Sequence, residues 1–416
     1  MSIASELTSH GHWRFEPLSK EFTADPYAAY ANLREEDDLY YFKDFDVWIA
    51  SRFEDVRALA LDKRMVRSLD GIATREALEA LQRRNNWHDM PYHERYVQVN
   101  LLESDGPVHD RLRRQIFGYF TSSAVNHWQA LIQDYVDGLL DSLSGRDEID
   151  FVSELASHVP GHIIGRMLGV PDEDCPKLRE WSEEIVRYFD IDRTEEKKRI
   201  AENATREFAE YMIALKAERE KNPKDDLISQ LLEVERNGGF LEDEFIATVM
   251  LILKAGHGST IDVLGSGMHA LLEFPDQMQK LRDDPTLIGT AVQEMFRYES
   301  PLPFFHRHNC EEIELKGRRY PKGTKFGLLY ASANRDPAVF PNPDSFDITR
   351  TPNRHIAFGA GPHFCLGNHL SRLDMEVIFT SLLNRFSSIE LLEKPNYKPG
   401  LQARGPQSLH LRLREA

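Results

Sequence analysis

Apolar residues recur at three- and four-residue spacing over most of the chain between about residues 53 and 298. Segments such as 129–140, 162–170 and 291–300 carry this pattern, which is typical of helices that pack one face against a core. One proline-free helical pattern covers 241–274, and at ~1.5 Å per residue it predicts a rod of roughly 50 Å. This part of the chain is therefore predicted to be helical.

Strands are predicted toward the two ends of the chain. A short helical pattern opens at Asp25, and the aromatic and β-branched residues of 39–50 predict a hairpin. After Pro301 the pattern breaks into short segments separated by turn residues, followed by a last helix over 367–386 and a closing strand near 409–413. No repeat or flexible linker marks a domain boundary. The pattern predicts a mostly α fold with a small β-rich side.

Charge and cysteine content narrow the classes of function. The 416 residues include 51 Lys and Arg against 68 Asp and Glu, a net charge of −17, and such an acidic chain is a poor candidate for non-specific binding to nucleic acid or an anionic membrane. The start of the chain shows no signal-peptide pattern, and the apolar segment 249–253 ends at Lys254, far short of a membrane span. Three cysteines are too few for a disulfide framework, so we expect a cytoplasmic location.

The middle of the long predicted helix contains two glycines, Gly256 and Gly258. Each costs roughly 1 kcal/mol relative to alanine in a helix interior, so helix propensity does not explain them. Close packing of a neighbouring helix is one explanation, and a bulky group lying against the helix is the other. The cysteine segment described next favours the bulky group.

The segment 358–367, FGAGPHFCLG, carries the clearest chemical signal. Its glycines and proline predict an irregular loop that places Cys365 at the start of the last helix, where unpaired backbone N–H groups and the positive helix end favour a thiolate. A dinucleotide loop does not fit, because Phe364 stands where GxGxxG requires its third glycine. A cysteine hydrolase stays open without a recognisable signature, and a haem thiolate fits best, since one axial sulfur holds the iron. Cys175 and Cys310 have no surrounding pattern and are expected to be inert.

Motifs along the chain follow the pattern of one family. The haem loop FGxGxHxCxG is matched at Phe358, Gly359, Gly361, His363, Cys365 and Gly367. An ExxR pair stands at Glu294 and Arg297, an HxxxR pair at His109 and Arg113, and residues 333–337 read ANRDP. With these motifs the chain resembles the cytochrome P450 superfamily, in particular its soluble, ferredoxin-dependent bacterial members.

The resemblance implies one haem-thiolate domain with the cytochrome P450 fold over residues 25–416, after an N-terminal extension over 1–24. Cys365 is implied to be the axial ligand of haem b iron. Phe358 is expected to shield the sulfur, and Gly367 belongs to the cofactor-binding loop.

Two sets of charged residues receive roles from the same resemblance. The groups expected to hold the haem propionates are His109, Arg113, Arg307 and His363. Glu294 and Arg297 lie three residues apart on one helix face, and with Arg350 they are implied to form a buried structural network.

The distal helix departs from the family at two positions. Most members carry an acid followed by an alcohol that relay protons, where this chain has Gly258 and Ser259. Ser259 is expected to supply a hydroxyl, while water, Thr260 or polar groups of the substrate replace the carboxylate. His257 points elsewhere, because one residue turns a helix by ~100°, and is expected to be structural or to pack beside the cleft.

The reaction implied is insertion of one oxygen atom of O₂ into a small organic substrate, as a hydroxylation or an oxidative O-demethylation. Peroxide-dependent relatives tend to carry Arg and Pro where Gly258 and Ser259 stand, which favours dioxygen here. A haem-thiolate rearrangement or dehydration enzyme and a non-catalytic haem ligand sensor remain alternatives.

The substrate pocket is expected along 87–100, 251–259 and 302–306. Its candidate lining residues are Trp87, Leu251, Ala255, Phe304 and Phe305. The polar and aromatic composition of these stretches favours a compact oxygenated molecule, such as an aromatic acid, an alkoxy-aromatic or a methylated sugar, over a long alkane.

No flavin or iron–sulfur motif is present, so electrons are expected from a ferredoxin and a ferredoxin reductase that uses NAD(P)H. The family's docking face lies on the cysteine side of the haem and is expected to be basic here. Its candidate residues are Arg111, Arg114, Arg354 and Arg372. No nucleic acid or membrane partner is expected.

Overall fold

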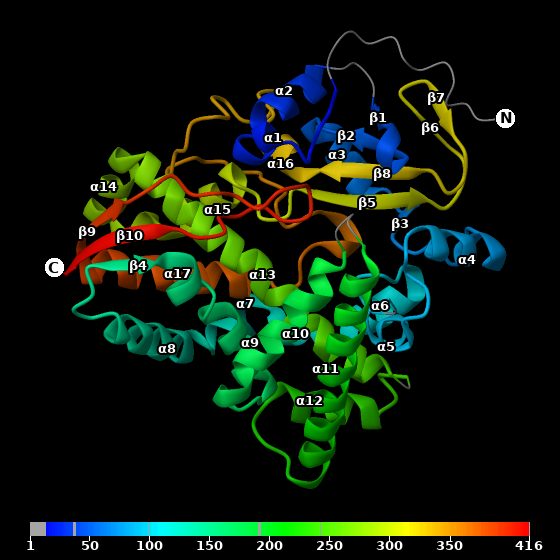
Figure 1. The fold of residues 1–416 in the computed structure, drawn as a ribbon, viewed down its shortest axis with the longest axis horizontal. Coiled ribbons are helices and arrows are strands. Elements are labelled where there is room, and N and C mark those ends of the chain that lie inside the picture. The colour runs from blue at the N-terminus through cyan, green and yellow to red at the C-terminus, as the bar shows by residue number, and fades with distance from the viewer. Residues whose placement is uncertain (1–13, 36–38, 99, 190–192, 242, 416) are drawn as a thin grey trace.

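A helical body holds most of the chain, and a small β-rich part covers one end of it, at the top of Figure 1. The computed structural model describes residues 14–35, 39–98, 100–189, 193–241 and 243–415. Its α-helices are α1 (Lys20–Ala24), α2 (Tyr27–Glu35), α3 (Phe53–Leu61), α4 (Arg75–Arg84), α5 (Pro91–Tyr96), α6 (Gly106–Ile116), α7 (Ser122–Asn126), α8 (Gln129–Ser142), α9 (Val159–Leu168), α10 (Cys175–Arg187), α11 (Glu195–Lys221), α12 (Leu227–Arg236), α13 (Glu244–Glu273), α14 (Pro275–Asp283), α15 (Ile288–Tyr298), α16 (Tyr330–Ala333) and α17 (Asn368–Arg385). The strands are β1 (Tyr40–Phe42), β2 (Val47–Ala50), β3 (Met65–Val66), β4 (Glu148–Asp150), β5 (Phe304–Asn309), β6 (Ile313–Leu315), β7 (Arg318–Tyr320), β8 (Lys325–Leu329), β9 (Phe386–Leu391) and β10 (His410–Glu415). The mostly α architecture with a small β side is confirmed.

The larger sheet has the strand order β1-β2-β8-β5-β3. β1 and β2 form the predicted hairpin, with Tyr40 opposite Ile49, and β2 runs parallel to β8. A second sheet joins β4, β10 and β9, so the closing strand predicted near 409–413 pairs with a strand of the helical body. Phe15 and Phe22 are buried against the larger sheet, so the described end of the predicted extension packs onto the domain.

The predicted long helix is confirmed as α13, which contacts α9, α10, α11, α15 and α17 in the centre of the body (Figure 1). Its two glycines have different surroundings. A Cβ at Gly256 would lie 2.2 Å from Ile164 Cδ1, so close packing explains this glycine. A Cβ at Gly258 would meet no heavy atom within 4 Å, so the space beside this residue is open.

The predicted last helix, 367–386, is confirmed as α17, which begins three residues after Cys365. Within the ranges described above, no helix combines the length and the apolar character needed to cross a bilayer.

Candidate functional site: the cysteine loop and the open face of α13

Glycine conformation shapes the loop that carries Cys365. Gly359 and Gly361 both have φ of +72°, a left-handed conformation that side chains other than glycine rarely adopt. A Cβ at Gly361 would also lie 2.4 Å from the carbonyl oxygen of Ala60. The Cys365 N–H donates to the Phe358 carbonyl at 2.9 Å, which closes the loop just before α17.

The surroundings of the Cys365 sulfur contain opposing influences. Burial raises the pKa of the thiol, while the backbone N–H of Gly367 and the guanidinium groups of Arg113 and Arg372 lower it. The Gly367 N–H therefore favours the thiolate as predicted, but in the polypeptide alone burial outweighs it and the pKa of Cys365 is raised. A bound cation would supply the missing stabilisation, since thiolate is the form that ligates metals.

Phe358 is buried beside the loop, and its ring centroid lies 4.4 Å from that of Phe296. The guanidinium carbon of Arg372 lies 4.8 Å from the Phe358 ring centroid. This apolar and cationic wall covers one side of the segment that holds Cys365. Gly367 has open space where a Cβ would stand.

The predicted propionate partners gather near this loop. The rings of His109 and His363 lie 4.5 Å apart, and Arg113 donates to the Phe364 carbonyl at 2.8 Å. Arg307 is 4% exposed, donates to the His306 carbonyl, and has no ion-pair partner among the described residues.

Asp105 is a member of this group that the sequence prediction missed. His363 Nε2 lies 3.2 Å from one Asp105 oxygen, and the other oxygen accepts the N–H groups of Arg67 and Ser68 at 2.8 Å. Burial and nearby positive charges lower the pKa of His363, although Asp105 opposes this shift. The available signal was Asp105 followed by Gly-Pro, since Asp commonly precedes a helix and Pro is common in its first turn.

Haem fits the groups that lack partners here. His109 Nε2 is buried without a hydrogen-bond partner, and the buried guanidinium of Arg307 faces no paired carboxylate, so both can receive propionate oxygens. The described residues contain no cluster of three or more His, Cys, Asp or Glu that could hold a metal ion. Cys365 is the residue whose sulfur would hold a haem iron.

One side of α13 provides the space for a flat group. Ala255 is exposed, and Lys254, Gly258 and Ser259 are partly exposed, although the helix is buried on both sides of this segment. We call these four residues the open face of α13; they span an arc of roughly 140° on the helix. This exposure in the centre of the body supports the explanation that a bulky group lies beside Gly258.

The two hydroxyls next to Gly258 differ in their contacts. Thr260 is 2% exposed, and its Oγ1 lies 3.0 Å from Ser371 Oγ on α17, so it belongs to a helix contact. Ser259 lies on the open face. His257 is buried, with Nδ1 3.0 Å from the Leu253 carbonyl, and this agrees with the expected structural role.

The predicted charge network is present in the fold. Arg297 Nε and Nη2 each donate to Glu294 at 2.7 Å, and both side chains have 0% exposure. Arg350 Nε lies 3.1 Å from Glu294, and Asn353 donates to the same carboxylate at 3.0 Å. The Asp347 N–H adds a further bond at 2.9 Å. Glu294 thus compensates two guanidinium groups at once.

The candidate pocket residues do not all lie in the same part of the structure. Phe304 packs against Gly327, where a Cβ would lie 2.3 Å from Phe304 Cε2, and joins the apolar cluster that contains Phe15. Phe305 packs with the other cluster, and Arg67 lies 5.6 Å from its ring centroid. Successive residues of a strand face opposite sides, so the expectation that both rings form the pocket wall is wrong, and only Phe305 stays a candidate.

Three further pocket candidates lie in different surroundings. Leu251 is 7% exposed within the main core, whereas Ala255 belongs to the open face. Trp87 packs at ring distances of 5.0 Å and 5.4 Å from Tyr188 and Phe189.

The predicted basic docking patch is smaller than expected. Arg111 forms a bidentate ion pair with Glu244 at 2.6 and 2.7 Å, and Arg372 packs on Phe358, so neither offers a free surface charge. Arg114 and Arg354 are exposed and have no ion-pair partner within the described ranges. These two arginines are the docking candidates that remain as free surface charges.

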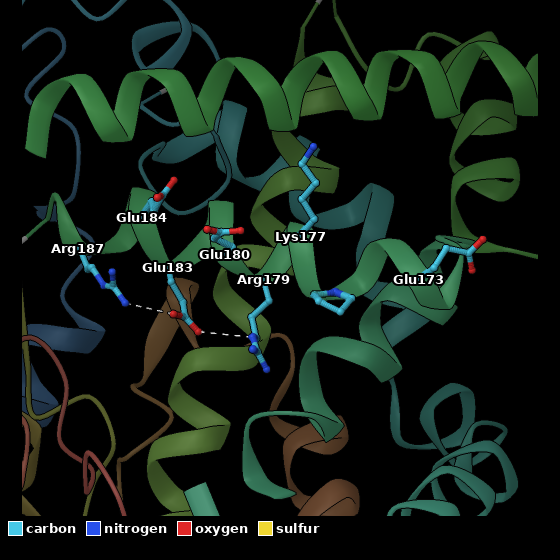
Figure 2. Close-up of a pocket in the computed structure, with 8 residues that line it drawn as sticks. Glu173, Lys177, Arg179, Glu180, Glu183, Glu184 and Arg187 are labelled. Atoms are coloured by element: carbon cyan, nitrogen blue, oxygen red, sulfur yellow. Dashed lines mark hydrogen bonds and ion pairs between the residues drawn. The ribbon is translucent and has the colours of Figure 1, made fainter. Parts of the chain in front are cut away.

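A separate groove of about 580 Å³ lies along α10 (Figure 2). Its lining residues are Glu173, Pro176, Lys177, Arg179, Glu180, Glu183, Glu184 and Arg187. Glu183 pairs with Arg179 and Arg187 at 3.7 and 3.4 Å across its wall. The groove contains none of the predicted site residues, and its lining is charged, so it is a surface feature separate from the cysteine loop.

Comparison with known proteins assigns the family. The protein-family model described as Cytochrome P450 matches residues 63–402 of this chain. Polyketide biosynthesis cytochrome P450 PksS of Bacillus subtilis (strain 168) is 34% identical and aligned over 96% of this chain and 98% of its own. Cytochrome P450 monooxygenase PikC of Streptomyces venezuelae is 32% identical, over 95% of this chain and 93% of its own.

Solved structures agree in fold. P450BioI, solved in complex with hexadec-9Z-enoic acid ligated acyl carrier protein, superposes with a TM-score of 0.87 at 31% identity and covers 95% of this chain and 100% of its own. The myxobacterial cytochrome P450 CYP267B1 in complex with myristic acid gives a TM-score of 0.88 at 33% identity, over 96% and 99% of the two chains. This protein therefore belongs to the cytochrome P450 family of thiolate-ligated haem oxidoreductases, and it has the cytochrome P450 fold.

Proposed function

We propose that this cytochrome P450 inserts one oxygen atom of O₂ into a small organic substrate, with electrons from a ferredoxin. The observation that carries the proposal is the thiol of Cys365, held by the glycine loop just before α17, in a chain that also keeps an open face on α13. The haem, once held by this sulfur, supplies the activation of dioxygen. His109, Arg113, Arg307 and His363 are the side chains that we assign to its propionates.

Ser259 is the residue that we assign to proton delivery. Its hydroxyl can accept and donate a hydrogen bond at the same time. The open space beside Gly258 can hold a water molecule in the place of the carboxylate that most family members have there. Thr260 is the weaker candidate, because its hydroxyl is already engaged with Ser371.

Electron delivery is assigned to the surface around Arg114 and Arg354. Arg114 is exposed on α6, and Phe117, three residues later, is 53% exposed. Basic charge beside exposed apolar area suits a transient complex with an acidic ferredoxin. The cytoplasmic location predicted from the few cysteines is part of the same proposal.

For the substrate we keep the compact oxygenated class, as an aromatic acid, an alkoxy-aromatic or a methylated sugar. Phe305 supplies an aromatic wall, and Trp87 with its neighbours supplies another. The fatty acyl compounds bound to P450BioI and CYP267B1 make long-chain acids the second class to screen.

The test measures NADH, oxygen and product with the purified holoprotein, a surrogate ferredoxin and its reductase. Monooxygenation predicts one product per NADH and O₂, whereas a rearrangement enzyme forms product without consuming oxygen and a sensor gives a spin shift without turnover. Ser259→Ala is expected to divert NADH from product, and the adjacent Thr260→Val serves as the matched control that keeps coupling. Coupling in Ser259→Ala equal to that of the wild-type protein would remove Ser259 from the relay.

A further inference from the structure

Lys254 lies in the centre of the protein, and no carboxylate of the described residues forms an ion pair with it. It lies on α13, one helical turn before Gly258, so its side chain leaves the helix within roughly 40° of the open space beside that glycine. Its Nζ lies 4.9 Å from the ring centroid of Phe189. Among the described residues it forms no ion pair. An ammonium in such a place is costly unless an anion joins it.

The wall around Lys254 is aromatic. Phe189 packs against Trp87 at 5.4 Å and against His93 at 6.0 Å. His93 is fully buried, and burial lowers its pKa to about 3, with the charge of Lys254 as a second cause. His93 is therefore neutral at physiological pH, and the aromatic wall contributes no negative charge.

The carboxylate whose charge reaches Lys254 is already paired. Glu103 raises the pKa of Lys254, but burial outweighs it and lowers that pKa to about 8. Both Glu103 oxygens accept from Arg67 Nη2, at 2.7 and 2.9 Å. Counted over the described residues alone, Lys254, Arg67 and Glu103 leave one net positive charge, in a chain whose total is −17.

We propose that Lys254 binds the carboxylate of an organic acid substrate and orients the apolar body of that substrate along the open face of α13. This inference rests on the proposed function and narrows its substrate class to acids. At 1.5 Å per residue, Lys254 and Ser259 are about 7.5 Å apart along the helix axis, a span that fits an aromatic acid held by its carboxylate. The aromatic wall of Phe189 and Trp87 suits such a ring.

The experiment compares 4-methoxybenzoate with 4-methoxybenzamide, a neutral molecule of nearly the same shape. Calorimetric binding to the holoprotein gives the affinity, and the haem spectrum gives the position of the ligand. In Lys254→Met we expect the acid to bind at least tenfold more weakly and the amide to change less than threefold. Lys254→Arg keeps the charge and is expected to stay within tenfold of the wild-type affinity for the acid.

Lys177→Met is the matched control, because Lys177 also lies over an aromatic ring, 4.8 Å from the Trp181 centroid, but at the protein surface. Equal losses for acid and amide in Lys254→Met, or no loss for the acid, would overturn the anchor. An acid that fails to bind the wild-type protein would overturn it too. Failure of oxygen insertion is distinguishable, since it abolishes product from acid and amide alike while the preference of Lys254 for the acid persists.

Discussion

Replacing Glu294 with Gln tests how strongly the fold depends on its buried charge network. The amide keeps the shape of the side chain but removes the charge that compensates Arg297 and Arg350. Because Glu294 and Arg297 are both fully buried, solvent cannot screen the guanidinium that remains. Breaking a buried ion pair on one side costs about 3–5 kcal/mol, against a total stability of about 5–15 kcal/mol.

The chain contains its own matched control. Glu233 and Arg236 on α12 have the same three-residue spacing and also form an ion pair, but their side chains are 65% and 50% exposed. Exposed pairs contribute about 0–1 kcal/mol, so Glu233→Gln is expected to be nearly neutral. Urea unfolding followed by far-ultraviolet circular dichroism measures both variants, and the haem band reports retention of the cofactor. A shift for Glu294→Gln no larger than that for Glu233→Gln would refute the reasoning.

Further expectations concern packing, electron transfer and pH. Gly256→Ala should lower the melting temperature because its Cβ would meet Ile164 Cδ1 at 2.2 Å, whereas Gly258→Ala should raise stability by up to about 1 kcal/mol, since helix propensity improves and nothing lies within 4 Å. Arg114→Glu should slow ferredoxin reduction of the haem in stopped-flow measurements and leave substrate affinity unchanged; equal rates would remove this residue from the docking surface. Burial raises the pKa of Asp262 from 3.8 to about 6, so the protonated carboxyl is favoured in the folded state and stability should fall as pH rises from about 4 to 6. Asp262→Asn should flatten that slope in urea titrations, and an unchanged slope would contradict the assignment.

Much of the site was predictable because its signals are local in the sequence. The loop before α17 needs glycine at two left-handed positions, so the spacing of Gly359, Gly361 and Cys365 predicts its conformation. The i, i+3 spacing places Glu294 and Arg297 together on any helix. Both features follow from backbone geometry, and the structure agrees with both.

The errors concern contacts between distant segments. Phe304 and Phe305 are adjacent in sequence, yet the pleat of β5 sends them to opposite sides of the sheet. Arg111 has the positive charge expected of a docking residue, but in the folded chain it forms an ion pair with Glu244 on α13, which is 133 positions later in the sequence. Lys254 reads as the residue that ends an apolar segment, and only the folded chain places it beside Phe189.

The buried charged groups differ in whether the anion beside each of them has to stay bound. Asp374 is a buried carboxyl with an unpartnered oxygen, and burial raises its pKa well above the ordinary value, so it avoids the cost of desolvation by keeping its proton. Arg307 keeps its charge, because a guanidinium does not lose its proton at any physiological pH, so an anion beside it would lower the cost of its burial. Lys254 lies between these cases, since burial lowers its pKa to about 8 and brings the neutral amine within reach. A permanently bound haem propionate is therefore the anion that we propose beside Arg307, whereas Lys254 tolerates an empty site between turnovers, as the proposed substrate anchor requires.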